Sequence, residues 1–86
     1  GGNIGMDRLK DMEKNVKYST EPRNGKYQCA CCLNYTFDTL HEHDFCPVCG
    51  WEDDSLQDEY MDYGGGANEM SIRQARAAFK AGKPVE

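Results

Sequence analysis

The sequence predicts a small α+β domain that is stapled by a metal ion, and three observations support this. Two Cys-x-x-Cys pairs, at positions 29/32 and 46/49, lie on either side of a short spacer. The chain has 86 residues, of which 38% are hydrophobic, so its apolar core must be thin and needs a cross-link. An apolar pattern with helical spacing begins beside Ser71 and predicts a C-terminal helix.

The metal site is predicted from the two cysteine pairs. Four thiolates can surround a tetrahedral ion when two turns each present two sulfurs on one side. The predicted ligands are Cys29, Cys32, Cys46 and Cys49. Zinc is the expected ion, because structural four-cysteine sites prefer it, and iron is the alternative. In the second pair, Pro47 stiffens the turn and Gly50 can adopt a positive φ. Cys31 is interpreted as a free thiol.

A β-hairpin is predicted between the two pairs. Residues 33–37 alternate apolar and polar side chains, as in a half-buried strand. Residues 41–44 form a polar turn, and Phe45 begins the return strand, so the metal is expected at the open end of the hairpin. This is the layout of zinc ribbons and rubredoxins. Trp51 is expected to cover the hairpin as a core residue.

The remaining segments divide the chain into three parts. Residues 1–5 precede Met6 and are interpreted as a cloning remnant. Residues 6–26 form an N-terminal arm, either as a short amphipathic helix over residues 7–16 or as a frayed, charged segment. Residues 27–86 form the metal-binding domain, which includes the C-terminal helix.

The C-terminal helix is predicted over residues 71–81. Ser71 is a candidate N-cap, and Gln74 completes a capping box. Ile72 and Phe79 are expected to face the core, while the cations of this helix are exposed to water.

The segment between hairpin and helix is harder to assign. Residues 52–63 are acidic, with Leu56 and Tyr60 placed to share one face of a short helical turn. The three glycines at 64–66 indicate either a flexible hinge or a tight backbone path.

Charge is distributed unevenly along the chain, whose formal net charge is −5. Residues 27–72 contain ten Asp and Glu residues and no Lys or Arg. Such a field repels nucleic acid and attracts basic proteins. The acidic run after the second cysteine pair is the expected docking surface. Its candidate partner-binding residues are Trp51, Glu52, Asp53 and Asp54.

Other kinds of site are not predicted. His41 and His43 are interpreted as solvated turn residues, because several residues separate them from either cysteine pair. Asp53 and Asp54 are interpreted as helix caps or partner contacts, since a calcium site needs more oxygen ligands. Four thiolates close the coordination sphere and no nucleophile–base motif is found, so no enzyme is expected.

No apolar run is long enough to cross a membrane, and the cysteine usage favours a reducing, cytoplasmic setting.

Several short motifs form a recognisable series. They are Cys29-x-Cys31-Cys32, Cys46-Pro47-x-Cys49-Gly50-Trp51-Glu52-Asp53-Asp54, Gln57-Asp58, Gly65-Gly66-Ala67-Asn68, Ser71 and Ala75-Arg76. Together they resemble the cysteine-rich CPCC family of small bacterial proteins. The resemblance implies a zinc-ribbon-like domain with an appended helix, and some members look like immunity proteins encoded beside secreted toxins. The chain departs from the family pattern at Ala30 and Leu33, where the family has proline and glycine.

These observations favour a non-catalytic, zinc-binding interaction module whose partner is a basic protein, a toxin among the candidates. The alternative is a rubredoxin-like electron-transfer protein that binds iron, although the cysteine pairs of rubredoxins are farther apart. A nucleic-acid-binding zinc ribbon is less favoured, because the hairpin carries no basic stripe.

Overall fold

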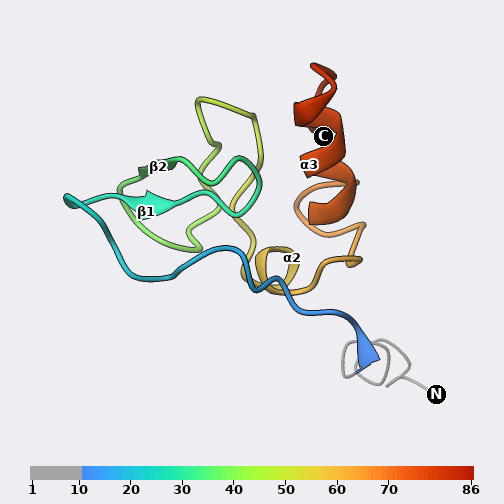
Figure 1. The fold of residues 1–86 in the computed structure, drawn as a ribbon, viewed down its shortest axis with the longest axis horizontal. Helices are drawn as coiled ribbons and strands as arrows, with labels where there is room; N and C mark the ends of the chain where they lie inside the picture. The colour runs from blue at the N-terminus through green and yellow to red at the C-terminus, as the bar shows by residue number, and fades with distance from the viewer. Residues whose placement is uncertain (1–10) are drawn as a thin grey trace.

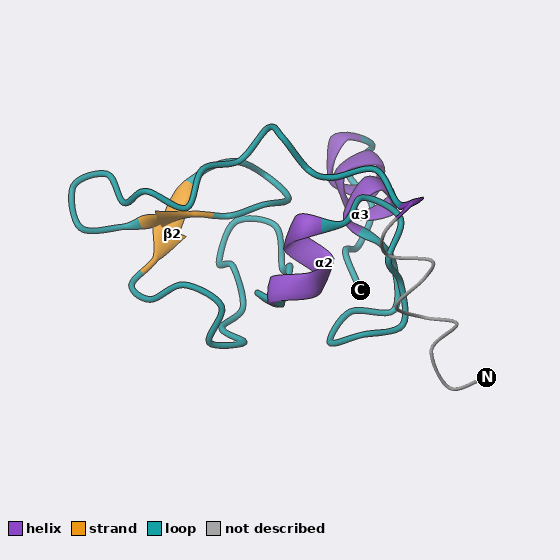
Figure 2. Ribbon diagram, turned by 90° about the horizontal axis from the view of Figure 1, so that it is seen from below, coloured by secondary structure: helices purple, strands orange, loops and turns teal. Residues whose placement is uncertain are grey.

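The computed structural model describes residues 11–86 and contains little regular secondary structure. Its elements are β1 (Tyr27–Gln28), β2 (Tyr35–Phe37), α2 (Ser55–Glu59) and α3 (Ile72–Lys80). The cysteine-bearing loops lie between the β1–β2 hairpin and α3 (Figure 1). Figure 2 shows that most of the remaining chain is loop wrapped around these elements. No helix in the described range is long and apolar enough to cross a membrane.

The first knuckle (residues 29–33) and the second knuckle (residues 46–50) fold in the same way. In each, the fifth residue donates its N–H to the carbonyl of the first cysteine, at 2.9 Å in the first knuckle and 2.8 Å in the second. The N–H of that cysteine donates to the residue after the loop, at 2.8 and 2.9 Å. Each Cys-x-x-Cys segment is therefore closed at its base, like the turn of a small hairpin.

The strand pairing differs from the prediction. β1 and β2 pair antiparallel across the first knuckle, with Tyr27 opposite Phe37. The predicted pairing of residues 33–37 with a return strand at Phe45 is wrong, because Phe45 bridges Glu52 across the second knuckle instead. The cysteines thus lie at the closed ends of two short hairpins rather than at the open end of one.

Both knuckles end on a residue with a positive φ. Gly50 has a φ of 88°, which glycine adopts without strain, and Leu33 has a φ of 68°. A leucine in this region brings its Cβ too close to the following carbonyl oxygen. Because Leu33 stands where the family pattern has glycine, this departure introduces strain into the first knuckle.

Leu33→Gly is expected to stabilise the protein by about 1 kcal/mol, because relief of the strain outweighs the added freedom of the unfolded chain. Chemical denaturation with metal bound measures the change. Gly50→Ala is the opposite substitution at the equivalent position and should destabilise the second knuckle. Lower stability of Leu33→Gly would show that packing of the leucine side chain dominates.

α3 begins as the sequence predicts. Ser71 is its N-cap, and the reciprocal capping box with Gln74 is present, with bonds of 3.2 and 2.9 Å. Ile72 and Ala75 are fully buried, whereas Phe79 is 38% exposed. The prediction that Phe79 belongs to the core is therefore wrong, because the helix extends beyond the small core that its first two turns cover.

α2 buries polar residues instead of apolar ones. Leu56 is exposed, contrary to the expected apolar face, while Gln57 and Asp58 are fully buried. The adjoining glycines are a tight backbone path and not a hinge. A Cβ on Gly66 would lie 3.0 Å from Gln57 Cδ and 3.1 Å from a carboxylate oxygen of Asp54, so the loop lies directly against α2 and its N-cap.

From residue 12 to residue 26 the N-terminal arm forms no helix or regular strand, only turns, bends and isolated bridges. The expected remnant at residues 1–5 and the first part of the expected helix, residues 7–10, lie outside the described residues. Residues 12–16 are not helical. Lys14 instead forms a bridge with Tyr60, and Asn15 N–H donates to the Glu59 carbonyl at 2.7 Å. The arm therefore lies along α2.

Arg76 joins α3 to the first knuckle. Its guanidinium donates to the Ala30 carbonyl through Nε and Nη2, at 3.1 and 2.7 Å, and to Asn15 Oδ1 at 2.8 Å. The expectation that all the cations of this helix face water is wrong for Arg76, while exposed Arg73 forms surface ion pairs with Glu13 and Asp62. Burial lowers the pKa of Arg76 despite the nearby cysteines.

Arg76→Gln is expected to destabilise the domain by about 2 kcal/mol, because it removes charged hydrogen bonds and leaves a carbonyl of the first knuckle unpaired. Arg73→Gln on the same helix is the matched control and should change stability far less, because exposed ion pairs contribute little. Urea denaturation of both variants provides the comparison, and equal losses would contradict this role of Arg76.

Candidate metal centre

The sulfur atoms of the four predicted ligands lie within 4.8 Å of one another. Between knuckles, Cys29 Sγ is 3.6 Å from Cys49 Sγ, and Cys32 Sγ is 3.7 Å from Cys46 Sγ. A tetrahedral ion with metal–sulfur bonds of about 2.3 Å places sulfurs about 3.8 Å apart. A disulfide requires about 2.05 Å. The donor set and its spacing therefore fit a four-thiolate metal ion and not a pair of disulfides.

The surroundings of these sulfurs combine apolar burial with polar contacts. Cys29 and Cys46 are buried, and both belong to one core cluster with Trp51, which is 0% exposed. The prediction of Trp51 as a core residue is confirmed. Thr36 Oγ1 lies 3.3 Å from Cys46 Sγ, and Arg76 binds the Ala30 carbonyl inside the first knuckle. Hydroxyl and guanidinium groups beside thiolates stabilise their negative charge.

The four thiols influence one another's protonation. Hydrogen bonding with the neighbouring thiols, that of Cys32 first, raises the pKa of Cys29, whereas hydrogen bonding with Cys29 lowers the pKa of Cys46. Four thiolates so close together repel one another, and a bound cation removes the repulsion by taking the place of the protons. Metal affinity should therefore fall as the solution becomes acidic.

Cys31 is buried beside this centre, but its sulfur is not part of the group of four. It lies in the core cluster together with Ala30 and Phe37. A buried free thiol behaves as a small apolar side chain.

Cys46→Ser and Cys49→Ser are each expected to lose the metal and to unfold, since one neutral hydroxyl replaces a thiolate ligand. Cys31→Ser is the matched control and should keep both metal and fold. Native mass spectrometry reports the bound metal, and circular dichroism reports the fold. Loss of the metal from Cys31→Ser would show that the ligand set is assigned incorrectly.

The predicted partner-binding run needs correction. Trp51 is 0% and Asp53 1% exposed, so neither can contact a partner while the domain is folded. Asp54 is the N-cap of α2 and accepts hydrogen bonds from two backbone N–H groups there, which agrees with its interpretation as a cap. Glu52 is half-buried, and its carboxylate oxygen Oε2 lies 3.6 Å from His43 Nδ1. The run mainly organises the interior of the domain.

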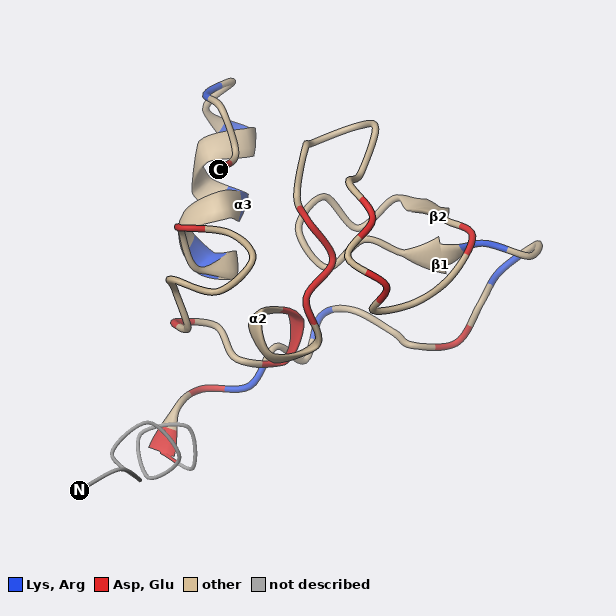
Figure 3. Ribbon diagram, turned by 180° about the vertical axis from the view of Figure 1, so that it is seen from behind, with Lys and Arg blue, Asp and Glu red and all other residues tan. Residues whose placement is uncertain are grey.

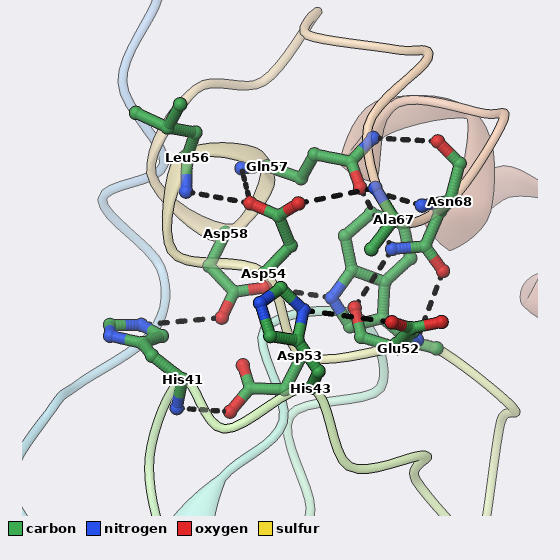
Figure 4. Close-up of polar contacts among 11 residues, drawn as sticks. His41, His43, Glu52, Asp53, Asp54, Leu56, Gln57, Asp58, Ala67 and Asn68 are labelled. Atoms are coloured by element: carbon green, nitrogen blue, oxygen red, sulfur yellow. Dashed lines mark hydrogen bonds and ion pairs between the residues drawn. The ribbon is translucent and has the colours of Figure 1, made fainter.

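Gln57 and Asn68 form a polar latch that the sequence analysis missed. The Gln57 amide donates to the Asn68 carbonyl at 2.9 Å and accepts from the Asn68 N–H at 2.8 Å. Asn68 in turn exchanges two hydrogen bonds with the backbone of Glu52, at 2.9 and 2.8 Å (Figure 4). The latch fixes the glycine loop to α2 and to the segment that follows the second knuckle.

His41 is also placed differently from the prediction. Its imidazole contacts buried Asp58, with 3.3 Å between Nε2 and Oδ2, and its side chain is only 28% exposed. His43 is 62% exposed, as expected for a solvated turn residue. Nothing in the sequence indicates that the two histidines differ, because both lie in the same polar turn. His41 is buried by its contact with Asp58 of α2, which only the tertiary fold brings close.

The family model described as Cysteine-rich CPCC matches residues 27–82. The match begins at β1 and covers both knuckles, α2 and α3. A search among curated proteins finds none that matches the chain.

Proposed function

The chain belongs to the cysteine-rich CPCC family, and from the geometry of its four cysteines we propose that it is a zinc-stabilised, non-catalytic module that binds a basic protein. The observation that carries the proposal is the convergence of four sulfurs from two knuckles within 4.8 Å. Such a closed sphere has no open position for a substrate, which supports a structural metal. A reducing, cytoplasmic setting would keep the four thiols free of disulfides and available to bind the metal.

The proposed docking surface is an acidic tip at the second knuckle. It consists of Glu42, Asp44, Phe45 and Val48, all of them exposed. Phe45 is 68% and Val48 50% exposed, which makes them two of the most exposed large apolar side chains in the described chain. An aromatic anchor rimmed by charge is a common arrangement at binding sites. Rigid knuckle geometry also reduces the ordering cost of binding.

The charge around this tip supports a basic partner. Figure 3 shows the acidic segments around residues 42–44 and 52–54 side by side, and backbone hydrogen bonds between residues 43 and 53 and between 44 and 53 join them. Two of the three cations of α3 offer little to an acidic partner, because Arg73 is paired with Glu13 and Asp62 at the surface and Arg76 is bound to the first knuckle. This also disfavours a nucleic-acid surface.

Electron transfer by bound iron is the second candidate, because a four-thiolate site accepts iron as well as zinc. Cys32 and Cys49 are only half-buried, so the centre lies close to the surface. Purification from cells distinguishes the two, since an iron form absorbs visible light and a zinc form is colourless. A coloured, iron-loaded protein would overturn zinc as the metal.

The partner proposal can be tested by isothermal titration against the product of an adjacent toxin gene. Binding is expected at low salt and should weaken as salt rises. No heat and no complex at low salt would overturn the immunity form of the proposal.

Glu42→Lys combined with Asp44→Lys is expected to slow association at low salt on the order of tenfold, because steering by the acidic tip is lost. Surface plasmon resonance measures the rate. Glu69→Lys with Glu86→Lys is the control, since it makes the same change in net charge beside α3. Equal slowing by both pairs would show that total charge, and not the tip, governs binding.

A further inference from the structure

We propose that His41, Asp53 and Asp58 form a second metal site, distinct from the four cysteines, that takes a divalent ion such as zinc. The three side chains come from the turn before the second knuckle, from the segment after it and from α2. One imidazole nitrogen and one oxygen of each carboxylate lie within 4.8 Å of one another. Figure 4 shows the three groups converging.

Each of the three side chains also has a buried polar atom that is left without a hydrogen bond. Within residues 11–86, His41 Nε2, Asp53 Oδ1 and Asp58 Oδ2 are buried and have no hydrogen-bond partner. His41 Nε2 and Asp58 Oδ2 face each other at 3.3 Å but lack the alignment of a hydrogen bond. Buried polar atoms are nearly always satisfied. Three unsatisfied ligand atoms at one point indicate a missing shared partner, which a cation would supply.

The other oxygen of each carboxylate is already held in place. Trp51 Nε1 donates to Asp58 Oδ1 at 2.7 Å, and the His41 backbone N–H donates to Asp53 Oδ2 at 2.5 Å. Such outer hydrogen bonds orient the ligands of metal sites. Each carboxylate thus directs one fixed, unpaired oxygen toward the imidazole.

The charge of the pair also requires compensation. Asp53 and Asp58 are 1% and 0% exposed, so two carboxylates share one buried site. Burial, followed by the close approach of the Asp53 carboxylate, raises the pKa of Asp58 to about 9. Apart from His41, the facing groups add negative charge or none: Asp54 contributes to the same shift, and burial and then Asp58 raise the pKa of Tyr18. A single proton neutralises only one of the two carboxylates, whereas a divalent ion neutralises both and can contact all three atoms at once.

Access and ligand type favour a transition metal. A surface cavity of about 630 Å³, lined by His41, Tyr18 and Glu59 among others, reaches the imidazole from solvent. One nitrogen and two oxygen ligands suit zinc better than calcium or magnesium, which prefer oxygen alone. The bound ion would tie the turn at His41 to α2.

The test starts from protein that carries one zinc at the cysteines and adds zinc near neutral pH. Native mass spectrometry should count two zinc ions per chain in the wild type and one in His41→Asn and Asp58→Asn. Asparagine tolerates the positive φ of position 41, so His41→Asn adds no backbone strain. In Asp58→Asn, the amide oxygen of the new asparagine can still accept the hydrogen bond from Trp51. His43→Asn, also at a positive φ, is the control and should keep two.

A second readout is the pH dependence of stability relative to Asp58→Asn. With one zinc, the raised pKa of Asp58 means that the folded state holds an extra proton, so the wild type should lose relative stability as the pH rises toward about 9. With excess zinc, the stability of the wild type relative to Asp58→Asn should instead increase as the pH rises, because the ion displaces that proton. A single zinc at saturation in the wild type, or a second zinc retained by Asp58→Asn, would overturn the site and leave a shared proton as the explanation.

Discussion

The convergence of four sulfurs is the constraint on which the rest of the fold depends. The described core contains nine buried apolar residues, and three of these are cysteines. Two strands of two and three residues, with two short helices, cannot bury enough surface to stabilise a domain alone. A structural zinc ion contributes on the order of 10 kcal/mol in small zinc-binding domains. That is comparable to the whole stability of an average domain.

Polar side chains supply the second level of organisation. Asp54 caps α2, Gln57 and Asn68 fix the glycine loop, and Trp51 joins the core to Asp58. The acidic residues that follow the second knuckle are therefore mostly internal. The proposed docking surface is the acidic tip, which lies at the second knuckle beside two of the four cysteines. If the tip binds a partner as proposed, metal binding and partner binding should be coupled, because loss of the ion would release the tip.

The features that could be predicted from the sequence are local ones. The cysteine spacing identifies the ligands, and Ser71 with Gln74 marks the start of α3, because neighbouring residues make those structures. The burial of Asp53 and Asp58 could not be anticipated, since carboxylates are normally solvated. Strand pairing was also missed, because strands of two or three residues carry almost no periodic signal. The role of His41 could not be predicted either, because its contact with Asp58 depends on how α2 packs in the folded chain.

Reversible removal of the metal tests the central claim most directly. Chelation under reducing conditions should abolish the circular dichroism of the folded state and expose Trp51, which is the single tryptophan of the chain and is fully buried. One equivalent of zinc should restore both the dichroism and the fluorescence of the buried indole. Native dichroism and unchanged fluorescence in metal-free, reduced protein would contradict a fold that is held together by four thiolates and an ion.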